Sequence, residues 1–472
     1  MTSLIARLTV LAFAAVAGAA AQSAPDGEPL LRASWNGQAA NAFTTSTPDH
    51  PGQVEVDADG TGFYRLDRVP DGMSAIRARL DVTQRPAQWL QITYEIRGDD
   101  KSGWVTGLGY RLLGNDAKTV LEMSYDYPPC PRQPQAWSSC KAFAHIVEGA
   151  HTLEVFVNSL RGSAVDVRTV DVTAVAAESL QPTAAAVADM NHAFGWIRSN
   201  YFLAGRVDWE QARSRCAPAT FPRDFEPTVP FVRCLLRELP ENAHSSVSRK
   251  PAPSARPAPA HEIRRLETGT GYAKLATAAV DPGPESDAYA AAASGAITAL
   301  QAQGVANWII DLRGNGGGTV YAMLAAIASL IGPQSRPLVY WEQAGGRKIP
   351  VELTARGAEE GGKVQVAASG LKPPKTPTRI VVLVDKGCLS SCEILATMLT
   401  SQHNVSLIGQ PTGGFNTSNE ELTLRTPFRL MLTTAYVLDA SGKRRYPNVV
   451  PATAHAGDEA SWLAAAESLL AR

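Results

Sequence analysis

The stretch that most constrains the fold is Ile380–Glu393, in which an apolar run meets a group of small polar residues. Ile380–Val384 contains five apolar, mostly β-branched residues, as a buried strand does. Asp385-Lys-Gly and then Cys388-Leu-Ser-Ser-Cys-Glu follow, and Ile394–Leu399 has the composition of a helix. The sequence therefore predicts a strand, a tight turn and a helix, with serines at the start of the helix.

These serines have two interpretations. A side chain in such a turn is held rigidly, and the unpaired N–H groups of the first helical turn point outwards beside it. A nucleophilic serine needs this setting, because hydrogen-bond donors must already be in place for the oxyanion that it generates. Ser390 and Ser391 are both candidates, and the stretch alone does not choose between them. The alternative is a buried strand–helix unit in which a serine only caps the helix.

Residues 1–21 predict a secretory signal peptide. Met1–Arg7 carries one cationic side chain, Leu8–Val16 is mostly apolar, and small residues precede Gln22. An uncleaved anchor is the alternative, but the run is short and rich in alanine. No later stretch approaches the roughly 18 uninterrupted apolar residues that suggest a membrane-spanning helix. We therefore expect a periplasmic or secreted protein that is not an integral membrane protein after cleavage.

Charge and cysteine usage narrow the function classes. The formal net charge of −1 gives no electrostatic argument for a nucleic-acid partner. The six cysteines fall into three local pairs, and an exported protein can hold them as disulfides: Cys130 with Cys140, Cys216 with Cys234, and Cys388 with Cys392. For the last pair, free packed thiols are the alternative. No cysteine or histidine spacing typical of zinc occurs, so a structural metal is not expected, and nothing in the sequence implies a cofactor.

Residues 22–180 are expected to form a β-sandwich. Trp89–Arg97 alternates apolar and polar residues with the period of a half-buried strand, and turn signals such as Gly98-Asp-Asp recur. The layout resembles jelly-roll, carbohydrate-binding-like modules, which makes carbohydrate contact by this domain one interpretation. Four tryptophans would then stack on sugars, whereas the alternative is that they are core residues: Trp35, Trp89, Trp104 and Trp137.

A helical subdomain is predicted for residues 181–249. Ala184–Ile197 and Val229–Leu239 have apolar residues at helical spacing, and Asp208 is a candidate N-cap of another helix. A bond between Cys216 and Cys234 would staple two of these helices.

Two further segments complete the organisation of this multidomain chain. Residues 250–262 are rich in proline and alanine in their first part and are expected to be a linker. Residues 263–472 alternate strand-like and helix-like segments, which predicts an α/β core.

Two more segments bear on chemistry. Asp311-Leu-Arg-Gly-Asn-Gly-Gly-Gly318 follows a buried strand, and such turns let backbone N–H groups approach a ligand closely. The patterns of phosphate-binding loops are absent, and a tight structural turn is the alternative. His244 lies in a polar turn after a helix. It is either structural or solvated, or it is the base for a serine, because histidine accepts protons best near neutral pH.

Taken together, these motifs resemble a known family. Asp-Leu-Arg-Gly-Asn-Gly-Gly, then Ser-x-x-Glu, then Leu407-Ile-Gly-Gln-Pro-Thr-Gly-Gly414 is similar to the C-terminal processing (tail-specific) serine peptidases. The resemblance covers about residues 184–472. It implies a crotonase-like (ClpP/crotonase) α/β core and a serine-type endopeptidase that acts on a protein or peptide substrate. No PDZ-like segment is evident.

The resemblance also assigns roles to residues. Ser390, the first residue of Ser-x-x-Glu, is the implied nucleophile, and Glu393 closes the motif. The implied oxyanion donors are the N–H group of Ser391 and that of Gly317 or its neighbour Gly316.

The general base is inferred from a difference between this chain and the members of the family that use a Ser-Lys dyad. Members with a Ser-Lys dyad carry the lysine after Thr-Phe-Gly, but here Phe415 follows Gly413-Gly414, and no lysine lies between Lys386 and Lys443. The chain is more similar to the tricorn-core-like and retinoid-binding-protein-like branch, which uses a histidine. His244 is the implied general base, with Ser245 helping it.

The acid that would orient this base is not where that branch places it. Arg445 and Ala452 occupy the two acidic positions of the branch motif, and Glu420 or Glu421 could serve instead. The missing acid leaves a second hypothesis open, that the chain is a non-catalytic peptide- or ligand-binding protein on the same scaffold.

Overall fold

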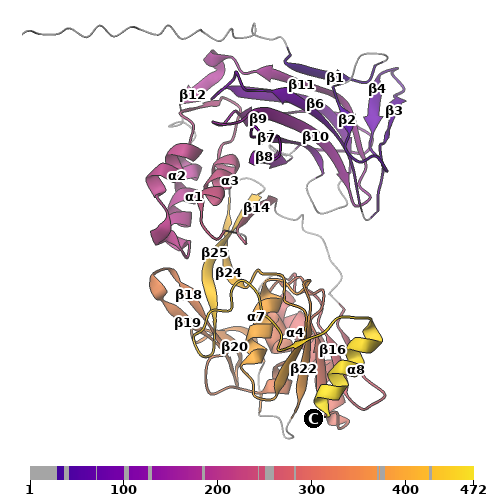
Figure 1. The fold of residues 1–472 in the computed structure, drawn as a ribbon, viewed down its shortest axis with the longest axis vertical. Coiled ribbons are helices and arrows are strands. Elements are labelled where there is room, and N and C mark those ends of the chain that lie inside the picture. Colours follow the sequence, from indigo (N-terminus) through magenta and orange to yellow (C-terminus); the bar gives the residue numbers. More distant parts are fainter. Residues whose placement is uncertain are drawn as a thin grey trace, which may run out of the picture. The chain divides into compact units, whose positions relative to one another are not determined.

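The computed structural model contains two compact units, residues 1–185 with 219–226, and residues 186–218 with 227–472 (Figure 1). The predicted signal peptide and most of the predicted linker lie outside the described residues. Among the residues described, no helix combines the length and apolar character needed to cross a membrane. The described residues are 29–36, 42–70, 72–99, 106–125, 130–182, 187–242, 244–249, 260–280, 283–368, 371–372, 378–424 and 428–471.

The first unit is the predicted β-sandwich, and all of its strand pairs are antiparallel. One sheet has the order β3-β4-β11-β6-β9 with β1 paired to β11, and the other has the order β2-β5-β10-β7-β8. The strands of the first sheet are β1 (Leu31–Ser34), β3 (Gln53–Val56), β4 (Gly62–Arg65), β6 (Trp89–Gly98), β9 (Ser138–His145) and β11 (Val165–Ala174). Those of the second are β2 (Thr44–Thr45), β5 (Met73–Asp81), β7 (Gly107–Leu113), β8 (Val120–Tyr125) and β10 (Thr152–Leu160).

Alternation along β6 explains why the sandwich forms. Leu90, Ile92, Tyr94 and Ile96 are all buried and join apolar side chains of the second sheet in one core. Burying one face of each sheet against the other removes apolar surface from water, which is the main driving force of such a fold. Cys130 and Cys140 form the predicted disulfide, which links the segment before β9 to β9 itself.

The tryptophans of this unit are mainly core residues. Trp35 and Trp89 are only 6% and 5% exposed, so neither offers a ring face to a sugar. The guanidinium groups of Arg97 and Arg168 each lie 4.5 Å from the ring centroid of Trp137. Trp104 lies outside the described residues. A carbohydrate surface on this unit stays a prediction that these three residues do not support.

The first unit also contains residues 219–226, from the middle of the predicted helical subdomain. β13 (Thr220–Pro222) pairs with β12 (Leu180–Pro182), which follows a 3₁₀ turn at Ala177–Ser179. Phe221 and Phe225 pack against Trp89, with ring centroids 5.8 and 4.9 Å away. The predicted segment 181–249 is therefore divided between the two units.

Helices open the second unit. They are α1 (Val187–Asn200), a 3₁₀ turn at Ala204–Arg206, α2 (Trp209–Cys216) and α3 (Thr228–Glu238). Asp208 caps α2 as predicted, because its carboxylate accepts a hydrogen bond from Gln211 N–H at 3.0 Å. The predicted disulfide between Cys216 and Cys234 links α2 to α3.

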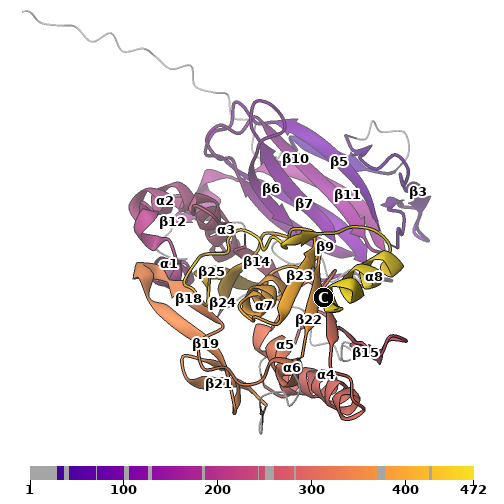
Figure 2. The same cartoon turned by 60° about the horizontal axis from the view of Figure 1, so that its bottom comes forward.

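A mainly parallel sheet forms the predicted α/β core, in the order β15-β16-β17-β22-β23-β26. Alternate residues of β17 and β22 face opposite sides: Ile310 and Val382 belong to an apolar cluster with residues of α4, α5 and α7, whereas Ile309 and Val381 belong to one with residues of α8. Figure 2 shows α8 apart from α4, α5 and α7. The strands are β15 (Glu262–Arg265), β16 (Gly271–Lys274), β17 (Trp308–Asp311), β22 (Ile380–Val384), β23 (Val405–Gly409) and β26 (Thr453–Ala454). The helices are α4 (Pro284–Ala302), α5 (Val320–Ala326), α6 (Ala328–Ile331), α7 (Ser391–Thr400) and α8 (Glu459–Leu470).

An antiparallel sheet completes this unit, with the order β14-β25-β18-β19-β20-β21 and β24 paired to β25. Because β14 and β24 both pair with β25, the segment after His244 is brought beside the segment after Phe415. The strands are β14 (Ser246–Arg249), β18 (Val339–Gln343), β19 (Lys348–Thr354), β20 (Gly357–Glu360), β21 (Lys363–Ala367), β24 (Thr417–Thr423) and β25 (Phe428–Asp439), with a 3₁₀ turn at Ala344–Gly346.

Candidate active site

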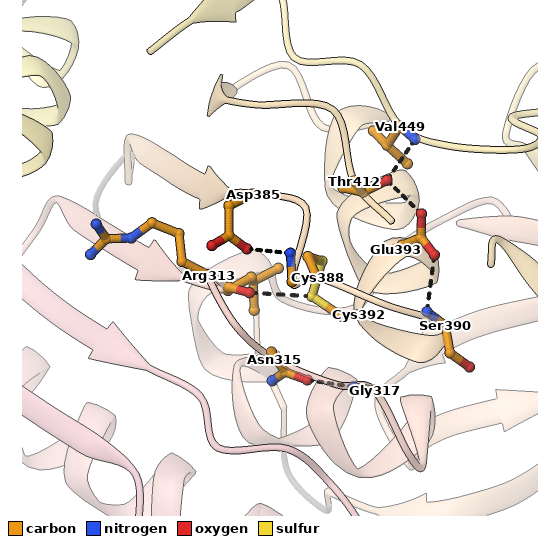
Figure 3. Close-up of a disulfide and its surroundings, with 12 residues drawn as sticks. Arg313, Asn315, Gly317, Asp385, Cys388, Ser390, Cys392, Glu393, Thr412 and Val449 are labelled. Carbon is orange, nitrogen blue, oxygen red and sulfur yellow. Dashed lines mark hydrogen bonds between the residues drawn. A yellow bond between two sulfur atoms is a disulfide. The ribbon is translucent and has the colours of Figure 1, made fainter. Parts of the chain in front are cut away.

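Ser390 lies in the sharp turn between β22 and α7, as the sequence predicts. Its φ of 55° and ψ of −121° are unusual for a residue with a side chain, and such strain is held only where the surroundings fix it. The backbone N–H donates to Glu393 Oε2 at 3.0 Å, while the side chain points away from that carboxylate (Figure 3).

The carboxylate of Glu393 holds this turn in place through hydrogen bonds to backbone N–H groups. Its carboxylate is fully buried and also accepts from Thr412 Oγ1 at 2.5 Å (Figure 3). It accepts as well from Gly414 N–H at 2.9 Å and Phe415 N–H at 2.7 Å. A buried carboxylate is tolerated when donors surround it in this way. Glu393 therefore ties the turn to the segment that follows β23, and its oxygens are occupied by structural donors.

A disulfide brackets the same turn. Cys388 and Cys392 are bonded, with Cα atoms 5.3 Å apart, and neither side chain is exposed (Figure 3). Of the two alternatives open for this pair, the structure has the bond. The carbonyl of Cys388 also accepts from Gly413 N–H at 3.0 Å. The chain on both sides of Ser390 is thus restrained covalently and by hydrogen bonds.

The glycine turn after β17 packs directly against the serine turn. Gly317 has a φ of +91°, and a Cβ atom there would lie 2.5 Å from the Leu389 carbonyl and 3.0 Å from Ser391 N. Leu389 N–H donates to the Asn315 carbonyl at 3.0 Å, and Ser391 Oγ donates to the Gly318 carbonyl at 2.5 Å. Only glycine permits this close approach of two backbones.

The backbone N–H groups of the two turns differ in whether they have an acceptor. Gly317 N–H donates to Asn315 Oδ1 at 2.9 Å, and Gly316 N–H donates to Thr277 Oγ1 at 2.9 Å, so the two glycine N–H groups named from the sequence already have acceptors. Ser391 N–H and Gly318 N–H have no acceptor among the described residues. Gly318 is the last residue of the Gly-Gly-Gly run, and the sequence analysis did not name it.

His244 lies in the same unit, just before β14. Its Nδ1 is 2.7 Å from Thr417 Oγ1, and its ring centroid is 5.3 Å from that of Phe415. Asn419 Nδ2 donates to the His244 carbonyl at 3.3 Å, and Ser245 Oγ accepts from Thr433 N–H at 2.9 Å. Burial lowers the pKa of His244 to about 4, so the imidazole is neutral at pH 7.

Among the residues that the structure describes, no carboxylate contacts either ring nitrogen of His244. Glu421 is paired with Arg429 at 3.0 Å, and Glu420 contacts neither ring nitrogen. Arg445, which occupies the position expected for an acid, pairs with Asp439 at 2.8 Å. The group on Nδ1 is the hydroxyl of Thr417, and the sequence signal for it is weak, because a threonine at the start of a strand is common.

Ser390 and His244 line one cleft of about 520 Å³. Among the residues described, no group of three or more histidine, cysteine or acidic side chains could hold a metal ion. The described lining is His244, Ser286, Gly318, Thr319, Val320, Tyr321, Trp341, Gln343, Glu360, Gln365, Val366, Ser390, Ser391, Ile394, Thr417, Ser418, Asn419, Glu420, Met431, Thr434 and Ala435. An accessible serine, a neutral histidine and unpaired backbone donors in one cleft are the parts of a serine-hydrolase type of site.

Comparison with known proteins agrees with a serine-hydrolase type of site. Residues 270–451, which lie within the α/β core, match the model of peptidase family S41. His244 precedes the matched segment. The matches do not separate the branches of the family.

Two relatives match part of this chain. The nisin-resistance protein of Lactococcus lactis subsp. lactis is 31% identical over 131 residues, 28% of this chain and 40% of the relative. The carboxy-terminal processing protease CtpA of Bacillus subtilis is 31% identical over 148 residues, 31% of this chain and 28% of the relative. The chain thus spans less than half of either relative.

Solved structures are similar at lower identity. A lipoprotein from Streptococcus agalactiae is 18% identical, with a TM-score of 0.47 over 59% of this chain and 95% of that chain. The photosystem II D1 C-terminal processing protease is 22% identical, with a TM-score of 0.30 over 46% and 49%. The CBM22-1 xylan-binding domain of Paenibacillus barcinonensis Xyn10C is 14% identical, with a TM-score of 0.25 over 33% and 99%.

Proposed function

We propose that the protein is an exported serine peptidase that hydrolyses peptide bonds through an acyl-enzyme at Ser390. The observation that carries the proposal is that Ser390, His244 and two backbone N–H groups without acceptors among the described residues, those of Ser391 and Gly318, belong to residues that line one cleft. The S41 match of the α/β core supports the same reaction class.

In the proposed mechanism Ser390 Oγ attacks the substrate carbonyl while His244 Nε2 takes its proton. Nδ1–H donates to Thr417 Oγ1, which selects the tautomer that leaves Nε2 free to accept. The N–H groups of Ser391 and Gly318 stabilise the oxyanion of the tetrahedral intermediate. The imidazolium then protonates the leaving amine, and a water molecule hydrolyses the ester that remains on Ser390.

The histidine-dependent branch of the family is the one we propose for this chain. Phe415 packs against the His244 ring, near the position where the dyad branch carries its lysine. Thr417 replaces the usual acid, and a neutral hydroxyl stabilises an imidazolium less than a carboxylate does. Glu420 and Glu421 are not part of this arrangement.

An extracytoplasmic location is part of the proposal. Three disulfides occur among the described residues, and such bonds persist in oxidising compartments. The first 21 residues have the pattern of a cleavable signal.

A fluorophosphonate probe tests the function, because it reacts only with an activated serine. We expect the wild-type protein to be labelled, Ser390→Ala to be unlabelled, and His244→Ala to be labelled about 10²–10⁴-fold more slowly. His403→Ala is the matched control, since His403 is exposed and outside the cleft, and it should behave as wild type. An unlabelled wild-type protein that also leaves casein intact would instead be a non-catalytic binding protein.

A further inference from the structure

The charged residues that line the cleft are all acidic in the part of the chain that the structure describes. Glu360 and Glu420 contribute carboxylates, and no lysine or arginine is among the described lining. His244 does not offset them, because burial keeps its imidazole neutral. The cleft that holds Ser390 therefore presents negative charge to whatever enters it.

Glu360 is fixed by aromatic neighbours. Its Oε2 accepts from Tyr321 OH at 2.6 Å, and that hydroxyl in turn accepts from Trp341 Nε1–H at 3.2 Å. Trp341 is 3% exposed, and Tyr321 and Glu360 are half-buried. This chain of hydrogen bonds places one carboxylate at a defined point in the cleft wall.

The charge of Glu360 is not balanced within the described residues. The adjacent Glu359 is buried and forms a bidentate pair with Arg356, at 2.9 and 2.5 Å. Glu360 has no such ion pair, although Lys363 stands opposite it in the β20–β21 register. Lys363 is exposed and does not line the cleft.

A half-buried carboxylate with one neutral donor gains most from a cation. Partial burial removes water that would otherwise solvate the charge, so an incoming ammonium or guanidinium forms a charge-assisted hydrogen bond. The half-buried ring of Tyr321 can also accommodate the apolar stem of a lysine or arginine.

We propose that the cleft binds a peptide with lysine or arginine next to the scissile bond, and that Glu360 selects this residue. The inference rests on the proposed function and names the substrate class of the same site. Because Ser390 and Glu360 line one cleft of about 520 Å³, the selected side chain belongs to a residue adjoining the bond that is cut.

Matched fluorogenic peptides test the selection. They differ only in lysine, norleucine or glutamate at the residue before or after the scissile bond, and kcat/KM is measured for each. We expect wild type to prefer lysine over norleucine at one of these positions by about tenfold or more, the range of a charge-assisted hydrogen bond. Glu360→Gln should reduce the ratio to near one, and Glu360→Lys should favour glutamate. Glu267→Gln, on an exposed turn outside the cleft, should keep the wild-type ratio.

The outcomes separate this inference from the function on which it rests. If the probe labels Ser390 but wild type cleaves the peptides without preferring lysine, the serine-peptidase function stands and the inference is wrong. A lysine preference that survives in Glu360→Gln, with wild-type thermal unfolding, also overturns the role of Glu360. If neither labelling nor cleavage occurs in wild type, both proposals fail.

Discussion

At the scale of single residues, the proposed site depends on a histidine that stays neutral. His244 is buried against Phe415, and its Nδ1 contacts a hydroxyl rather than a carboxylate. An adjacent anion would stabilise the imidazolium and raise the pKa, whereas burial alone lowers it. A base of low pKa keeps its proton-accepting form over a wide range of pH, although it accepts a proton less strongly.

The pH dependence of activity follows from this pKa. The basic form of His244 is lost as pH falls through about 4, so we expect kcat/KM to stay level down to about pH 5 and to fall below it. Stability depends on pH over a wider interval. The histidine of the unfolded chain has an ordinary pKa near 6.5 and binds a proton before the folded form does, so the free energy of unfolding declines as pH falls from about 6.5 towards 4. The measurement is a pH–rate profile restricted to the range where the protein stays folded. An acidic limb near pH 6.5 would show that the base is an unperturbed histidine.

Sequence alone predicted the candidate site residues that belong to a recognisable motif. Ser390 was predicted from Ser-x-x-Glu and His244 from its position after a helix, and the structure brings both to one cleft. Thr417 was missed because it contacts His244 across 173 residues, through a strand register that no local pattern encodes. Gly318 was missed because the engagement of Gly317 N–H depends on how Asn315 turns, which composition does not reveal.

At the scale of elements, the glycine turn and the serine turn act as one structure. A Cβ atom on Gly317 would meet the backbone of Leu389 and Ser391, whereas one on Gly316 would meet only Thr277 side-chain atoms at 3.6 Å or more. Gly317→Ala should therefore displace the oxyanion donors and lower kcat/KM about 100-fold or more. Gly316→Ala is the matched control and should stay within a few-fold of wild type. Equal losses in the two variants would contradict this account of the turn.

The disulfide beside Ser390 should affect geometry more than stability. Cys388 and Cys392 are separated by 4 residues, so the bond restricts the unfolded chain little, whereas Cys216 and Cys234 are separated by 18. A loop of about 15 residues is worth roughly 3 kcal/mol by the chain-entropy model. We expect replacement of the first pair by alanine to slow probe labelling with a small change in Tm, and replacement of the second pair to lower Tm. Labelling that is unchanged without the first bond would show that Glu393 alone holds the turn.

Local elements were predicted better than long-range ones. Ile380–Val384 is a strand with the expected bounds, and α7 begins at Ser391, where a helix starting at the serines was expected. Strands β14 and β24 were not predicted, because each depends on pairing with β25 rather than on its own residue pattern. These two strands position the segments of His244 and Thr417, which is why the environment of the base could not be read from sequence.

At the scale of the whole molecule, the chain passes from one unit to the other more than once. Residues 219–226 leave the helices of the second unit and add β13 to the first. Two apolar side chains explain why this short segment belongs to the first unit. Phe221 and Phe225 are only 2% and 6% exposed, because they pack against the sandwich. A division at residues 180/181, which composition suggested, would separate these side chains from the surface that buries them.

This passage predicts that the two units can be destabilised separately. Phe225 packs against Trp89 and Phe143, so Phe225→Ala should lower the free energy of unfolding of the sandwich by about 3 kcal/mol. Phe194→Ala, which removes a ring packed against Trp209 and Phe231, is the matched change in the second unit.

In urea titrations followed by tryptophan fluorescence and by probe labelling of Ser390, Phe225→Ala should unfold the sandwich at a lower urea concentration while labelling persists. Phe194→Ala should instead abolish labelling at lower urea. If both variants lost fluorescence and labelling in the same single transition, the units would fold as one cooperative structure, and the segment 219–226 would couple them rather than merely belong to one of them.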